Sequence, residues 1–110
     1  MLRERFIDDG RYAEAYVREK SRLSGWGARK IAMQLRQKGV SQGVITEALK
    51  QLDGDVELPR LVEKLRRKMR TTKYSSDYEL RGKLLRYALS LGFDYDMAQS
   101  AVDRSVAEDL

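Results

Sequence analysis

The sequence lacks the residue types on which most enzyme active sites and metal sites depend. Its 110 residues contain no cysteine and no histidine. The first absence excludes disulfides and thiolate chemistry, and the second removes the commonest general base and metal ligand. We therefore expect no catalytic, cofactor-binding or metal-binding residues and no small-molecule substrate. An enzyme built only on carboxylates, lysines and tyrosines is the weakest of the alternatives.

Long apolar runs are also absent. No segment approaches the roughly 20 apolar residues that a membrane helix requires, and the opening residues, MLRER, lack the apolar core of a secretion signal. We expect a soluble, cytoplasmic protein without a membrane partner. A basic amphipathic helix over residues 58–73 lying on an anionic membrane is a minor alternative.

The charge of the chain is unevenly distributed around a net value of +5. Residues 11–38 carry eight basic and two acidic side chains, residues 60–73 carry seven and one, and residues 94–110 carry one and five. Clustered positive charge indicates a polyanionic partner, such as nucleic acid or an acidic protein surface. The candidate binding residues are Arg18, Lys20, Arg22, Arg29, Lys30, Arg36, Lys38, Arg66, Arg67, Lys68, Arg70 and Lys73.

One sequence pattern occurs twice, 53 positions apart. The run KGVS at 38–41 and the run LGFD at 91–94 each contain a glycine, an apolar residue and a residue that can cap a helix. Pairs of apolar residues follow both runs at helical spacing. The pattern is typical of a helix that stops at glycine and a second amphipathic helix that begins just after it. Its repetition predicts tandem helical repeats, which present long surfaces for binding.

The apolar spacing predicts six helices and no strands, which makes the fold all-α. We expect two tandem three-helix repeats, helix-turn-helix-like and elongated, over residues 1–54 and 55–110. Asp8 is expected to cap the first helix, with Ile7 packing on Tyr12, and Pro59 is expected in the first turn of the fourth. Ser41 and Asp94 are the expected caps of the third and sixth helices.

Several side chains receive a structural prediction from their position in this pattern. Ser76 and Glu79 have the spacing of a capping box at the start of the fifth helix. The apolar stripes place Tyr12, Tyr16, Met33 and Leu89 among packing residues. Trp26 is expected to plug the first three-helix core, with an exposed contact as the alternative.

The chain also resembles a known family. The residues that carry the resemblance are Ile7-Asp8-Asp9, Arg11-Tyr12-Ala13, Gly27, Ile31, Gln34-Leu35, Lys38-Gly39-Val40, Ile45 and Ala48-Leu49. This pattern is similar to the central repeat of the RecX family of bacterial recombination regulators, and residues 58–107 resemble the family's last repeat. Since family members usually have three repeats, the chain resembles a C-terminal portion with two of them.

The resemblance implies a non-catalytic regulator that binds the groove of the RecA–DNA filament as a monomer and touches RecA, single-stranded DNA or duplex DNA. Inhibition of recombinase activity in DNA repair, recombination and the SOS response is the expected effect, with stimulation as the alternative. A different class of function is a stand-alone DNA-binding module of helix-turn-helix type. Against that alternative, Gln42, Thr46, Lys50 and Gln51 are the only evident donors on the expected third helix.

Overall fold

The helices follow one another without any strand in the part of the chain that the structure describes. The structure is a computed structural model that describes the backbone of residues 2–108 and the side chains of residues 9–107. The elements are α1 (Leu2–Glu19), the π-helical segment η1 (Lys20–Ser24), α2 (Ala28–Gln37), α3 (Gln42–Leu49), α4 (Gly54–Thr71), α5 (Asp77–Ser90) and α6 (Tyr95–Glu108). The prediction of an all-α fold is confirmed.

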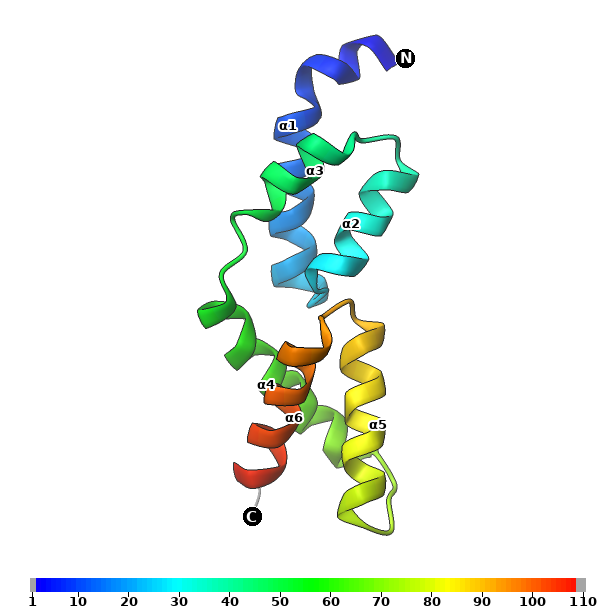
Figure 1. Ribbon diagram of the computed structural model, residues 1–110, viewed down its shortest axis with the longest axis vertical. Helices are drawn as coiled ribbons and strands as arrows, with labels where there is room; N and C mark the ends of the chain where they lie inside the picture. The colour runs from blue at the N-terminus through cyan, green and yellow to red at the C-terminus, as the bar shows by residue number, and fades with distance from the viewer. Residues whose placement is uncertain (1, 109–110) are drawn as a thin grey trace.

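The helices pack in two sets of three, one above the other in Figure 1. In the first set, Val17 of α1, Ile31 and Leu35 of α2 and Ile45 of α3 are fully buried together. In the second, Leu65 of α4, Leu84 of α5 and Val102 of α6 lie in a separate core. The predicted boundary between residues 54 and 55 stays a prediction, and α4 itself begins at Gly54.

The stacking of the two sets makes the molecule long. Its principal extents are 54 × 23 × 20 Å, and its radius of gyration is 16.0 Å. A compact domain of this length would have a radius of gyration of about 13 Å. The elongated shape that the sequence predicts is therefore confirmed.

The repeated glycine motif has the structure that its sequence predicts. Gly39 and Gly92 both adopt left-handed conformations, with φ of 89° and 101°, and end α2 and α5. Ser41 Oγ then accepts a hydrogen bond from the Val44 amide at 3.5 Å, and Asp94 Oδ1 accepts one from the Met97 amide at 2.8 Å. Both expected caps are confirmed.

Two helix starts lie earlier than predicted. Asp8 lies inside α1, which is already helical at Leu2, so Asp8 is not a cap. The predicted packing of Ile7 on Tyr12 involves the Ile7 side chain, which lies outside the described residues. Likewise Pro59 lies inside α4 because Asp53 caps that helix, its carboxylate accepting from the Asp55 amide at 2.9 Å. The fixed φ of proline suits a helix, but inside a helix its ring removes one backbone hydrogen bond and crowds the carbonyl four residues earlier.

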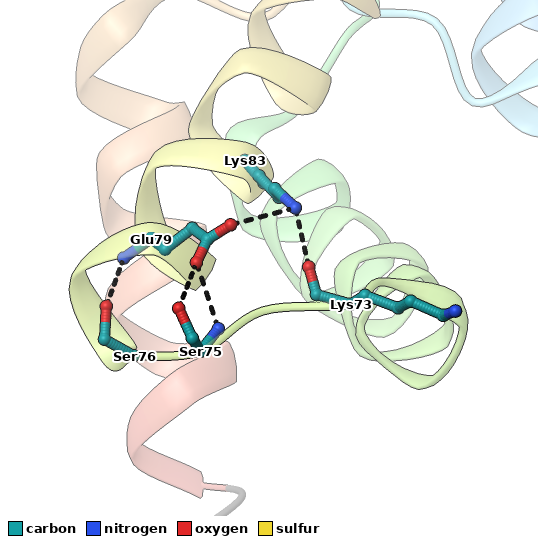
Figure 2. A network of polar contacts seen from close by, with 5 residues as sticks. All are labelled: Lys73, Ser75, Ser76, Glu79 and Lys83. Atoms are coloured by element: carbon teal, nitrogen blue, oxygen red, sulfur yellow. Dashed lines mark hydrogen bonds and ion pairs between the residues drawn. The ribbon is translucent and has the colours of Figure 1, made fainter.

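The turn before α5 is held by a polar network centred on Glu79 (Figure 2). Ser76 Oγ accepts from the Glu79 amide at 3.2 Å, as the capping box predicts. The Glu79 carboxylate, however, accepts from the amide and hydroxyl of Ser75, at 3.0 and 2.8 Å, instead of from the Ser76 amide. These bonds and the ammonium of Lys83 lower the pKa of Glu79 to about 2. Lys83 also donates to the Lys73 carbonyl at 2.6 Å, which ties α5 to the loop that follows α4.

The two repeats meet through the backbone at two glycines. The Gly27 amide donates to the Leu91 carbonyl at 2.7 Å, and the Arg29 amide donates to the Gly92 carbonyl at 2.9 Å. The free amides at the start of α2 are thus satisfied by the free carbonyls at the end of α5. A Cβ on Gly27 would lie 2.6 Å from the Gly92 carbonyl carbon, and one on Gly92 would lie 2.5 Å from the Lys30 amide nitrogen. Only glycine at both positions permits this approach.

Candidate functional site

Three of the predicted cations gather around two aromatic rings of the first repeat. Lys38 Nζ lies 5.6 Å from the centre of the Tyr16 ring, and Lys20 Nζ lies 5.5 Å from the same centre. Lys20 Nζ is also 5.1 Å from the Trp26 ring, over which Lys30 Nζ lies at 4.6 Å. We call this surface the aromatic–lysine face; it consists of Tyr12, Tyr16, Lys20, Trp26, Lys30 and Lys38.

The rings hold these lysines without neutralising them. A cation over an aromatic face is attracted by the electron density of the ring, but its full positive charge remains. Burial, with smaller contributions from Tyr12 and Glu19, raises the pKa of the Tyr16 phenol, so that this ring is uncharged at neutral pH. The ammonium groups of the aromatic–lysine face are therefore positioned and still available to an external anion.

The aromatic side chains lie at the surface more than their spacing predicts. Tyr12 is 42% exposed, and its ring lies 6.0 Å from that of Tyr16, which is half-buried. The prediction that Tyr12 is a core residue is wrong, because Ala13 and Val17 of α1 face the core instead. Trp26 is half-buried and packs against the first core, as a plug would, while its ring also supports two lysines.

A hollow at the junction joins cations of both repeats. It encloses about 400 Å³, with Trp26 and Phe93 among its apolar walls and Arg22, Arg60, Lys64 and Arg67 among its charged ones. A neighbouring hollow of about 220 Å³ brings Arg18 and Arg22 next to Arg60. Arg60 and Lys64 are not among the binding residues predicted from the sequence. The sequence shows that both belong to the basic run at 60–73. Their position opposite Arg22 could not be predicted, because it depends on how the two repeats stack.

Two carboxylates lie among these cations. Glu57 and Glu63 both line the larger hollow. Glu57 Oε2 is buried without a hydrogen-bond partner in the described structure, and burial raises the pKa of Glu57 against the opposing effect of Arg60. The hollow is still cationic overall, because four basic side chains face two acidic ones.

The basic cluster of α4 is partly compensated within the molecule. Arg66 Nη1 and Arg67 Nη1 lie 3.8 and 3.7 Å from the two carboxylate oxygens of Glu63. Lys68 points to another side of the helix, where its Nζ lies 4.8 Å from the centre of the Tyr87 ring. Arg70 and Lys73 are exposed near the end of α4. The structure thus divides this cluster, which the sequence presents as one run.

The remaining predicted cations lie on the outer side of α2. Arg29 and Arg36 are exposed, and Arg36 Nε donates to Gln42 Oε1 at 3.1 Å. Two apolar residues predicted to pack, Met33 and Leu89, are 45% and 38% exposed beside them. The packing prediction for these two residues is wrong, because the stacked repeats leave this side of α2 and the end of α5 uncovered.

The four donors expected on the third helix all have partners within the molecule, and two of them, Lys50 and Gln51, lie just after the end of α3. Gln42 Nε2 donates to Thr46 Oγ1 at 3.2 Å, and Gln51 Nε2 donates to the Glu14 carbonyl at 2.9 Å. Lys50 Nζ lies 3.3 Å from Glu47. This arrangement does not offer α3 as a reader of base edges.

The part of the chain that the structure describes contains no group of three or more acidic side chains placed to hold a metal ion. Over the same described residues, no helix combines the length and the apolar character needed to cross a membrane.

Comparison with known proteins identifies the repeats. Residues 8–49 match the family model for the second three-helix domain of RecX, and residues 55–102 match the model for the third. The chain belongs to the RecX family. The resemblance seen in the sequence is therefore confirmed. The second and third RecX domains follow each other along the chain in their family order. The first match ends at residue 49, before the loop that precedes α4, and the second begins at residue 55, after it.

Individual RecX relatives agree with this assignment. The chain is 34% identical over 103 residues to the regulatory protein RecX of Clostridium botulinum strain Eklund 17B, covering 92% of this chain and 48% of the relative. It is 38% identical over 101 residues to that of Clostridium perfringens strain 13, covering 89% and 46%. For Mycolicibacterium smegmatis RecX the identity is 32% over 107 residues, covering 94% and 57%. The chain thus spans about half the length of the curated relatives it matches, and no solved structure matches it.

Proposed function

We propose that the protein is a non-catalytic regulator that binds the RecA–DNA filament along its groove and limits recombinase activity. Membership of the RecX family carries this proposal, since the matched relatives are named regulatory proteins. We further propose that it acts in the cytoplasm as a monomer. Its role then belongs to DNA repair and recombination, where RecA filaments form.

The shape and charge of the molecule support the proposal. A body 54 Å long carries cations from the aromatic–lysine face, across the junction hollow, to the α4 cluster. A filament is a long anionic polymer, so that many weak charge contacts add along one extended footprint. We propose Arg18, Lys20, Arg22, Arg29, Lys30, Arg36, Lys38, Arg66, Arg67, Lys68, Arg70 and Lys73 as the residues that make these contacts.

Hydrolysis of ATP by RecA on single-stranded DNA tests the proposal. Titration with this protein is expected to lower the hydrolysis rate to a plateau, at concentrations that also give binding to the filament. A parallel titration with a RecX that has all three repeats shows whether two repeats are sufficient. An unchanged hydrolysis rate together with no binding to the filament would contradict the proposed function, whereas a raised rate would reverse its sign only.

A stand-alone DNA-binding module is the alternative, and one comparison separates the two. The engaged donors of α3 count against base reading, although the basic surface suits phosphate. A DNA module should bind naked DNA as tightly as coated DNA, with a steep dependence on salt. A filament regulator should bind RecA-coated DNA more tightly than either naked DNA or free RecA.

A further inference from the structure

A groove on the outer side of α2 differs from the other hollows in its chemistry. It encloses about 930 Å³ between α2, α3 and the turn that follows α5. Met33, Leu49 and Leu89 supply much of its apolar surface, and Arg29, Lys30 and Arg36 supply its charge. None of the described residues that line it is acidic, in contrast to the junction hollow with Glu57 and Glu63.

The groove is formed by the contact between the two repeats and does not need a partner to assemble. The Arg29 amide is hydrogen-bonded to the Gly92 carbonyl at 2.9 Å, so that the start of α2 is fixed against the end of α5. Along α2, Arg29, Met33 and Arg36 have the spacing of residues on one side of a helix. Lys38 lies on another side, over the Tyr16 ring. Lys30 belongs to both surfaces, so the groove and the aromatic–lysine face adjoin at this residue and are otherwise lined by different side chains.

The lining of the groove fits a protein segment better than a nucleic acid. Exposed Met33 and Leu89 offer adaptable apolar contacts to an apolar side chain. The aromatic ring at the groove, that of Phe93, is buried and offers no platform on which bases could stack. A groove that combines apolar side chains with a row of cations along α2 is complementary to a helix that has apolar residues at i and i+4 and carboxylates beside them.

We propose that this groove binds an acidic, amphipathic segment of the recombinase subunit. This inference rests on the filament-binding function proposed above, for which it supplies the protein contact. Arg29 and Arg36 pair with carboxylates of the segment, and its apolar side chains cover Met33 and Leu89.

Two apolar-to-acidic variants test the groove by binding. Met33→Glu and Leu89→Glu place a carboxylate on the floor without disturbing a buried side chain, and Tyr78→Glu makes a comparable change at an 89% exposed residue at the other end of α5. Both groove variants should bind the filament about tenfold more weakly than the wild type, whereas Tyr78→Glu should bind equally well. Circular dichroism confirms that all three variants are folded. If both folded groove variants bind as the wild type does, the groove proposal is wrong and the proposed function is unaffected.

The absence of cysteine permits a second, direct test. Met33→Cys carrying a benzophenone label should crosslink to recombinase on illumination of the assembled filament, and Tyr78→Cys with the same label should not. Mass spectrometry of the crosslinked peptide should identify a segment rich in Asp and Glu with helically spaced apolar residues. Crosslinking from position 33 to DNA, to a second copy of this chain or to a segment without carboxylates overturns the proposal. A wild-type protein that does not bind the filament would instead remove the proposed function on which the inference rests.

Discussion

The two repeats hold their cations in different ways, although they share a fold and a glycine motif. In the first repeat, Lys20, Lys30 and Lys38 lie over aromatic rings that leave their charge intact. In the second, Lys68 lies over the Tyr87 ring in the same way, but Arg66 and Arg67 share the carboxylate of Glu63. Equal numbers of basic residues in a sequence therefore need not give equal attraction for a polyanion. The first repeat should contribute more to the binding of an anionic polymer.

The second helices of the two repeats, α2 and α5, also begin differently. The start of α5 is capped by its own side chains, Ser76 and Glu79. The start of α2 at Gly27 has no side-chain cap, and its amides donate to carbonyls at the end of α5. The start of α2 in the first repeat thus depends on hydrogen bonds to the second repeat, whereas the start of α5 is capped by side chains of its own repeat.

The largest expected effect comes from adding a methyl group at the junction. Gly92→Ala has both a strained φ of 101° and a Cβ only 2.5 Å from the backbone of Lys30, so that the repeats must move apart. Its counterpart Gly39→Ala has a φ of 89° with nothing within 4 Å of the added Cβ. We expect Gly39→Ala to lower the free energy of unfolding by about 1 kcal/mol and Gly92→Ala by about 2–3 kcal/mol more. Urea denaturation measures both, and equal losses would contradict the tight junction.

Charge reversal should separate the two repeats functionally. Reversing Lys20, Lys30 and Lys38 to glutamate is expected to raise the half-maximal inhibitory concentration for filament ATP hydrolysis on the order of 100-fold. Reversing Arg66, Arg67 and Lys68 should raise it on the order of tenfold, because Glu63 already offsets part of that charge. Helicity should be retained in both triple variants. Inhibition that is unchanged in the second triple variant would remove the α4 cluster from the interface.

Neutralising one carboxylate should make the second repeat more like the first. Glu63→Gln releases Arg66 and Arg67 from the carboxylate that they share, so filament affinity should rise about two- to threefold. Glu47→Gln, on the exposed side of α3 where Lys50 is its partner, is the matched control for a lost negative charge. An equal rise in both variants would show that only net charge matters.

The smallest effect concerns the cap of α5. The pKa of Glu79 in the folded protein is about 2, below its usual value of 4.5. The stabilisation by this carboxylate is therefore present above pH 4.5 and is lost as the pH falls toward 2. The melting temperature of Glu79→Gln should lie slightly below that of the wild type at pH 6, and the difference should shrink as the pH falls from 4.5 to 2. A difference that is constant over this range would contradict the role of the charge.

Local features of the fold were predictable from the sequence, and features that depend on stacking were not. Gly39, Gly92, Ser41 and Asp94 act within a few residues of chain, so that their roles follow from residue type and spacing. The exposure of Met33 and the backbone contact of Gly27 depend on the position of the other repeat. No periodicity of one helix contains that information.

The candidate binding residues show the same limit. Their positive charge and clustering were evident from composition. The sequence did not show which of these charges lie over aromatic rings, because that depends on side-chain contacts between helices, such as Lys38 with Tyr16 and Lys68 with Tyr87. Arg60 and Lys64 join the basic surface only because α4 passes beside the end of α1 and η1.

The salt dependence of filament binding tests the role of the aromatic–lysine face most directly. The association constant for RecA-coated single-stranded DNA is measured over a range of salt concentrations for the wild type and for the triple variant Lys20→Gln, Lys30→Gln, Lys38→Gln. If these lysines meet the anionic polymer with their charge intact, the slope of log association constant against log salt should become shallower by roughly 2, about 0.7 for each lost ion contact. Parallel lines for the two proteins would contradict the account.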